Sequence, residues 1–99
     1  MSDDAVKTTT ITRVQKPSMW TVVFLNDDFT PMVFVVQILQ SIFHKSMLDA
    51  EQIMLRVHRE GRAMVGNYTC EVASHKADQA MGLAIFAQHP LQVFPERIA

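Results

Sequence analysis

The sequence predicts a single α+β domain of two layers, in which three helices cover one side of a three-stranded antiparallel sheet. Short apolar runs rich in β-branched and aromatic residues alternate with longer segments of helical periodicity, in the order β-α-α-β-α-β. With 99 residues, of which 48% are hydrophobic and 19% charged, the chain can bury one core but not two. Three strands cannot hide a hydrophobic face alone, so the helices must cover it.

The first strand is predicted over residues 20–25, a run that is almost continuously apolar and too short for a helix. The first helix is expected over about residues 31–44. Thr30 is a suitable N-cap, and Pro31 fits the first helical position, where its missing N–H costs nothing. The apolar stripe of this helix consists of Met32, Val35, Val36, Leu39, Ile42 and Phe43.

The second helix is expected from about residue 47 to residue 60. Ser46 followed three residues later by Asp49 resembles a capping box, which marks the start of a helix. Gly61 supplies a C-cap at its end.

The last third of the chain completes the sheet. Residues 62–72 are expected to form a second strand or, because Gly66-Asn67 is a turn signal, a hairpin-like bend. A third helix over residues 72–88 carries small alanines, which allow close packing on a sheet. Residues 91–94 make a short last strand, and Pro95 limits that strand to an edge or to its own end.

Composition and charge exclude several classes of partner. A formal net charge of -1 gives no field that would draw the protein to nucleic acid or to an anionic membrane. No stretch approaches the ~20 apolar residues of a membrane span, and the N-terminus lacks the regions of a signal peptide. Cys70 is the only cysteine, so an internal disulfide is impossible. We expect a cytoplasmic protein, and nothing in the sequence requires more than a monomer.

Residues 1–18 are polar and Thr-rich, which fits a flexible N-terminal extension ahead of a core domain over residues 19–99. No metal or cofactor is expected from this chain. Its four histidines lack metal-ligand spacing, and phosphate-binding and nucleophile motifs are absent. The histidines are His44, His58, His75 and His89.

The turn at Asn26, Asp27 and Asp28 is the candidate functional site. Asn and Asp are ordinary turn residues that often bond only to nearby backbone, and taken alone this turn has that explanation. Two features favour a ligand instead: three polar residues stand where one would suffice, and Phe29 and Met32 follow directly. A fixed anionic turn beside an apolar hollow suits a ligand with a cation next to a hydrophobic group.

Asp27, Asp28 and His58 permit two kinds of chemistry. A carboxylate can orient an imidazole for proton transfer, so a small acid/base enzyme is one hypothesis, although no nucleophile or oxyanion hole is evident. A binding site is the stronger hypothesis, because carboxylate, amide oxygen and neutral imidazole all accept hydrogen bonds from an ammonium group. Such charge-assisted hydrogen bonds contribute roughly 1.5–3 kcal/mol each.

Four linked motifs over about residues 17–94 resemble the ClpS family, the adaptors that deliver N-end-rule substrates to the ClpA unfoldase of the ClpAP protease. The family fold, similar to the C-terminal domain of the ribosomal stalk protein, agrees with the element order above. The motifs are Asn26-Asp27-Asp28-Phe29-Thr30-Pro31-Met32, Met54 to Gly61 with Val57-His58 at its centre, Gly66 to Ala73 with Lys76, and His89-Pro90-Leu91.

The resemblance implies a receptor for the free α-amino group of a polypeptide and its bulky first side chain, which is Leu, Phe, Tyr or Trp. Asn26, Asp27 and His58 resemble the residues that accept hydrogen bonds from the α-amine. Met32 corresponds to a gate that blocks β-branched first residues. The hydrophobic pocket corresponds to Thr30, Met32, Val35, Met54 and Val57, with Asp28 on its polar side.

The resemblance also implies a partner. Tyr68, Glu71 and Lys76 fall where the family meets the N-terminal domain of the unfoldase, and the polar arm matches an extension implicated in substrate handover. This sequence departs from the family pattern at Ser74-His75, beside that contact.

Two further departures concern the peptide site. Val33 stands where the family usually has Glu, which makes the helix start more apolar. Pro95 aligns with an apolar pocket residue, so a reshaped pocket floor is expected. An interaction-only module that has lost the pocket is the remaining alternative.

Overall fold

The computed structural model describes residues 18–98, so residues 1–17 of the predicted extension lie outside the described residues. The elements follow the predicted order. They are β1 (Trp20–Leu25), α2 (Met32–Ser41), α3 (Met47–Glu60), β2 (Arg62–Tyr68), α4 (Cys70–Phe86) and β3 (Gln92–Arg97).

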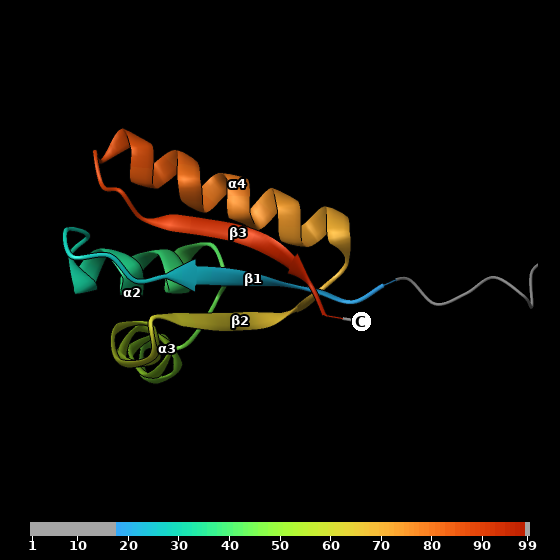
Figure 1. Cartoon of the computed structure of the whole chain (residues 1–99), viewed down its shortest axis with the longest axis horizontal. Coiled ribbons are helices and arrows are strands. Elements are labelled where there is room, and N and C mark those ends of the chain that lie inside the picture. The colour runs from blue at the N-terminus through green and yellow to red at the C-terminus, as the bar shows by residue number, and fades with distance from the viewer. Residues whose placement is uncertain (1–17, 99) are drawn as a thin grey trace, which may run out of the picture.

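The strands form one antiparallel sheet in the order β2-β1-β3, with β1 in the middle. Figure 1 shows α4 running along β3, whereas α3 is seen nearly end-on below the start of β2. The predicted fold class, an α+β domain with a three-stranded antiparallel sheet and three helices, is confirmed. Pro95 lies in β3, an edge strand, where its missing N–H is tolerated.

The core lies between β1 and the helices. Val22 and Phe24 of β1 are fully buried, and the Phe24 ring packs edge-on against Phe43 with 5.5 Å between ring centroids. Burying a side chain of this kind stabilises the fold by roughly 1.5–3 kcal/mol. The face of α4 toward the sheet is made of alanines, so its backbone approaches all three strands closely. These alanines are Ala73, Ala77, Ala80 and Ala84.

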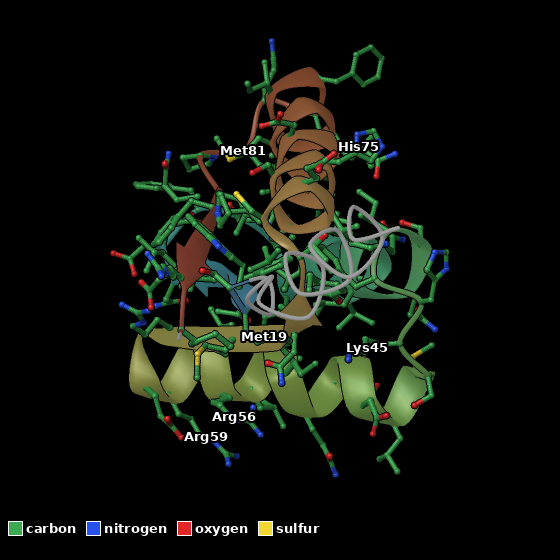
Figure 2. All side chains as sticks on the ribbon, turned by 90° about the vertical axis from the view of Figure 1, so that its right-hand side faces the viewer. Met19, Lys45, Arg56, Arg59, His75 and Met81 are labelled. Atoms are coloured by element: carbon green, nitrogen blue, oxygen red, sulfur yellow. The ribbon has the colours of Figure 1, made fainter. Side chains whose placement is uncertain are left out.

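One helix, α3, points charged side chains away from the core. Another helix, α4, is joined to the sheet by a side-chain hydrogen bond. Figure 2 shows Arg56 and Arg59 on the side of α3 away from the sheet, opposite the buried Ala50 and Val57. Met81 of α4 lies beside β3 in the same view, where its sulfur accepts a hydrogen bond from the Val93 N–H at 3.2 Å. No helix among residues 18–98 has the length and apolar character needed to cross a membrane.

Capping explains which helix boundaries the sequence predicted well. The Ser46 hydroxyl accepts from the Asp49 N–H at 3.1 Å, and Gly61 closes α3 in the left-handed conformation with φ 89°. Residues 47–60 are therefore helical as predicted. The helix predicted over 72–88 instead spans Cys70–Phe86, because Thr69 caps it through the Val72 N–H.

The predicted N-cap role of Thr30 is wrong. α2 begins at Met32 with Pro31 as its N-cap residue, and the Pro31 carbonyl accepts from the Phe34 and Val35 N–H groups. The Thr30 hydroxyl donates to the Asp27 carboxylate, a charged acceptor that makes a stronger hydrogen bond than a neutral group. The helix also ends at Ser41, short of the predicted residue 44.

The hairpin-like bend at Gly66-Asn67 does not occur, because both residues lie within the single strand β2. The register carries one extra residue on β2, since Thr21 pairs with Asn67 whereas Val23 pairs with Met64. Such a bulge is a frequent place for glycine. A Cβ at Gly66 would come within 3.1 Å of the Tyr68 hydroxyl, so glycine lets the Tyr68 ring fold back over the strand.

Candidate functional site

The turn between β1 and α2 is built around the Asp27 carboxylate. Its Oδ1 accepts from the Phe29 N–H at 2.8 Å and from the Thr30 N–H at 2.7 Å. Its Oδ2 accepts from the Thr30 hydroxyl at 2.8 Å. These bonds hold the turn in one conformation, so the structural role that Asp commonly plays in turns is present here.

Burial of Asp27 by itself would raise its pKa, because desolvation disfavours the charged form. The hydrogen bonds from Thr30 and Phe29, with a contribution from the charge of His89, outweigh burial and hold the pKa below its ordinary value. The carboxylate is therefore ionised at neutral pH. A carboxylate has about four lone-pair positions, so three hydrogen bonds leave capacity for one more donor.

One backbone hydrogen bond joins this turn to the end of α3. The Asn26 N–H donates to the Gly61 carbonyl at 2.9 Å, and the Gly61 N–H donates to the Val57 carbonyl at 2.9 Å. The left-handed Gly61 reverses the chain, which lets the last turn of α3 lie against the β1–α2 turn. His58, in that last turn, thereby lines the same cavity as Asn26 and Asp27.

The two elements enclose a cavity of about 180 Å³. Its lining combines polar groups from the turn and α3 with apolar side chains from β1, α2, α3 and the α4–β3 loop. Every residue predicted for the α-amine site and the pocket lies on its lining. The lining residues are Leu25, Asn26, Asp27, Asp28, Thr30, Met32, Val35, Met54, Val57, His58 and Leu91.

The inner wall of this cavity is more firmly packed than its rim. Val35, Val57 and Leu91 are 6%, 4% and 2% exposed, whereas Met32 at the rim is 45% exposed. The fixed residues set the shape of the hollow, and an unbranched methionine can adjust at its opening.

Leu25 and Leu91 line the cavity although neither was predicted to do so. Leu91 was assigned to the last strand, but β3 begins at Gln92. The His89-Pro90-Leu91 motif was the available signal, because a proline-containing loop next to a strand can place the following side chain in a cavity. The expectation that Pro95 stands at the pocket and reshapes its floor is wrong: Pro95 pairs with Val22 inside β3, outside the lining, whereas Leu91 lies on the lining.

The cavity offers hydrogen-bond acceptors and apolar surface, and it offers little else. Among the described residues no group of three or more His, Cys, Asp or Glu side chains could hold a metal ion. Cys70 is exposed at the start of α4 and does not line the cavity. The geometry therefore fits binding of a cationic group next to a hydrophobic one.

The three residues predicted to contact an unfoldase lie at the junction of β2 and α4. The Lys76 ammonium is 6.0 Å from the centroid of the Tyr68 ring and 5.8 Å from that of Phe43. It donates a hydrogen bond to the Ile42 carbonyl at 2.8 Å, at the C-terminal end of α2. Glu71 is exposed in the first turn of α4. Lys76 thus has a structural task of its own, and Glu71 projects freely from this surface.

Comparisons with known proteins identify the same family each time. Residues 15–94 match the model of the family "ATP-dependent Clp protease adaptor protein ClpS". A curated ClpS adapter of Paraburkholderia xenovorans is 52% identical over 84 residues, covering 85% of this chain and 81% of that protein. A ClpS adapter of Maricaulis maris is 53% identical over 93 residues, covering 94% of this chain and 84% of that protein.

The fold gives the same result. Agrobacterium tumefaciens ClpS2, solved bound to L-phenylalaninamide, superposes with a TM-score of 0.82 at 34% sequence identity. The match covers 84% of this chain and 100% of that structure. Proteins of this family are adaptors and not enzymes, so the acid/base hypothesis is set aside. The chain belongs to the family of ATP-dependent Clp protease adaptor proteins, ClpS.

Proposed function

We infer that this adaptor binds the free α-amino group and the bulky hydrophobic first residue of N-degron proteins, and delivers them to a ClpA-type unfoldase of the ClpAP protease. The observation that carries the proposal is one cavity whose lining combines hydrogen-bond acceptors with buried apolar side chains. A peptide N-terminus presents the matching pair of groups, an ammonium and an adjacent side chain.

The α-amine is assigned to Asn26, Asp27 and His58. The Asn26 amide oxygen, the remaining capacity of the Asp27 carboxylate and an imidazole nitrogen of His58 supply three acceptors on the cavity lining. An ammonium group has three donors. Charge-assisted hydrogen bonds of this kind contribute roughly 1.5–3 kcal/mol each, so losing the positive charge should weaken binding strongly.

The first side chain is assigned to the apolar half, formed by Thr30, Met32, Val35, Met54 and Val57 with Asp28 on its polar side. Leu91 joins this wall. An engineered protein cavity of roughly 150 Å³ binds benzene, and this cavity of about 180 Å³ is of that size. Met32 at the rim acts as the gate against β-branched first residues, whose branch lies close to the backbone and would meet its side chain.

The ligand of the Agrobacterium protein supports this assignment, because phenylalaninamide carries a free α-amine next to an aromatic side chain. For delivery, Tyr68, Glu71 and Lys76 are the proposed contact with the unfoldase's N-terminal domain. We further propose that the adaptor acts as a monomer in the cytoplasm, that residues 19–99 form the core domain, and that residues 1–18 serve as the flexible extension.

Peptide binding followed by fluorescence anisotropy tests the proposal. The labelled peptides begin with Phe, with N-acetylated Phe or with Val, and are otherwise identical. We expect the Phe peptide to bind, and acetylation or Val to weaken it by more than about tenfold, which corresponds to ~1.4 kcal/mol. Equal or absent binding across the set would contradict the proposal and leave an interaction-only module.

A pair of histidine variants distinguishes the loss of a cavity residue from a general effect of replacing a histidine. His58→Ala removes an acceptor from the cavity, and we expect it to weaken Phe-peptide binding by more than about tenfold. His75→Ala is the matched control, because His75 is exposed on α4 and lies outside the lining (Figure 2). Circular dichroism of both variants checks that the fold is retained.

A further inference from the structure

A second hollow of about 380 Å³ lies next to the peptide cavity, in the groove between α2 and α3. Its apolar lining consists of Met32, Val33, Val36, Met47 and Met54. Met32 and Met54 line the first cavity as well. The two hollows are therefore neighbours whose linings share two residues, and we call the second one the α2–α3 groove.

Three apolar side chains of the α2–α3 groove are exposed. Val33 is 63% exposed, Met47 is 55% exposed and Met32 is 45% exposed. No other element among residues 18–98 covers them. Adjacent exposed apolar side chains beside a binding cavity mark a surface that a ligand covers, whereas single exposed ones need no explanation.

We propose that the α2–α3 groove binds a second apolar side chain of the same peptide, at its second or third residue. This inference rests on the proposed function, because it needs the first residue to occupy the neighbouring cavity. It makes the adaptor selective for sequence beyond the first residue.

The geometry of an extended chain determines which side chains of a bound peptide can follow the first one into the neighbouring groove. Successive residues advance about 3.3 Å, and their side chains alternate in direction. The third side chain therefore points the same way as the first and lies about 7 Å along the chain. The second is closer to the anchor and reaches the groove if the peptide turns as it leaves the cavity.

The chemistry of the groove favours apolar side chains and disfavours acidic ones. Methionine is flexible and polarisable, so Met32, Met47 and Met54 can adapt to different occupants. Glu51 is the charged residue on the groove lining, and Asp27 and Asp28 line the adjoining cavity. A carboxylate on the peptide would meet like charges there, and neither lining carries a lysine or an arginine that could pair with it.

Peptides of the form Phe-X-Z test the inference, with X and Z each varied singly among Leu, Ser and Glu while the other is Ser. We expect Leu at one of the two positions to tighten binding by about five-fold over Ser, and Glu there to weaken it. No dependence on X or Z, with acetylation of Phe still abolishing binding, would overturn the groove proposal while leaving the proposed function intact. Loss of the acetylation effect would instead refute the proposed function.

A matched pair of valine variants assigns the effect to the groove. Val33→Glu places a carboxylate in the groove, and Val72→Glu makes the same change in the first turn of α4, where Val72 is also exposed. We expect Val33→Glu to remove the preference for Leu over Ser while the peptide with Ser at both positions binds as before. Val72→Glu should leave the preference unchanged. Equal preference in the Val33→Glu variant and the parent would overturn the assignment.

Discussion

The Asp27 carboxylate accepts three hydrogen bonds from its own turn and also faces the peptide cavity. The same bonds that shape the turn keep the carboxylate ionised, because they stabilise its charged form. Under the proposed function, fold stability and ligand recognition both depend on this one charge. Replacing it should therefore affect both.

The first prediction concerns this charge. The pKa of Asp27 is lower in the folded state than in the unfolded chain, so protonation favours unfolding. Its contribution to the free energy of unfolding is present above the unfolded pKa of about 4 and is lost as the pH falls through the folded pKa. We expect Asp27→Asn to be less stable than the parent at pH 6, with the difference shrinking toward pH 2.5. Urea unfolding at several pH values measures it.

The control for this series is Asp78→Asn, since Asp78 is exposed on α4 and outside the cavity lining. A stability difference between parent and Asp27→Asn that stays constant from pH 6 to pH 2.5 would show that the lowered pKa does not contribute.

Thr21 supplies a second prediction at this scale. Its hydroxyl is buried in the central strand and, among the described residues, has no hydrogen-bond partner. Thr21→Val keeps the shape and removes the unsatisfied group, so we expect the free energy of unfolding to rise by about 1 kcal/mol. Differential scanning calorimetry should show an increase in Tm of roughly 4–8 °C. An unchanged or lower Tm would mean that the hydroxyl finds a partner in solution.

At the scale of the elements, the end of α3 determines the shape of the cavity. Gly61 combines a left-handed φ of 89° with the carbonyl that accepts from the Asn26 N–H. It therefore joins the helix that carries His58 to the turn that carries Asp27.

We expect Gly61→Ala to lower the free energy of unfolding by about 1 kcal/mol, because a Cβ disfavours the left-handed conformation. Peptide affinity should fall with it, since the α3–turn connection is strained. Gly82→Ala is the matched control: Gly82 lies inside α4 with open space around it, so alanine should stabilise by roughly 0.5–1 kcal/mol and leave affinity unchanged. Chemical denaturation measures the stability of both variants, and anisotropy measures their peptide affinity. Identical effects of the two substitutions would contradict this role of Gly61.

The same elements show what the sequence could predict. The helix predicted over about residues 47–60 was placed correctly because its caps, Ser46 and Gly61, are local signals. Thr30 was misassigned because its hydroxyl donates to the Asp27 carboxylate instead of capping the helix. This hydrogen bond depends on the conformation of the folded turn, which the sequence alone does not show. Leu91 was missed as a cavity residue for a related reason, since the loop after α4 meets the β1–α2 turn only through the sheet.

On the scale of the whole molecule, the peptide cavity and the proposed unfoldase contact lie at opposite ends of β1. Leu25, at the cavity, pairs with Arg62, whereas Trp20 pairs with Tyr68 at the other end. Six residues of strand separate them by about 17 Å. Figure 1 shows this arrangement, with the β1–α2 turn at one end of the sheet and the start of α4 at the other.

The helix α2 runs between the same two regions. Met32 at its start lines the cavity, and the Ile42 carbonyl at its end accepts from the Lys76 ammonium. The proposed contacts with substrate and unfoldase lie at separate ends of the domain, so both can form at the same time.

The last prediction follows from this separation. Glu71 is exposed, so Glu71→Lys can reverse its charge without disturbing the core, although it loses about 0.3–1 kcal/mol of favourable interaction with the start of α4. We expect this variant to bind Phe-peptide within about twofold of the parent and to bind the ClpA N-terminal domain at least about tenfold more weakly. Anisotropy measures the first interaction and calorimetry the second. Asp78→Lys, a charge reversal at an exposed site further along α4, should change neither. Weakened peptide binding by Glu71→Lys in a folded protein would show that the two ends communicate, and unchanged ClpA binding would move the contact away from the start of α4.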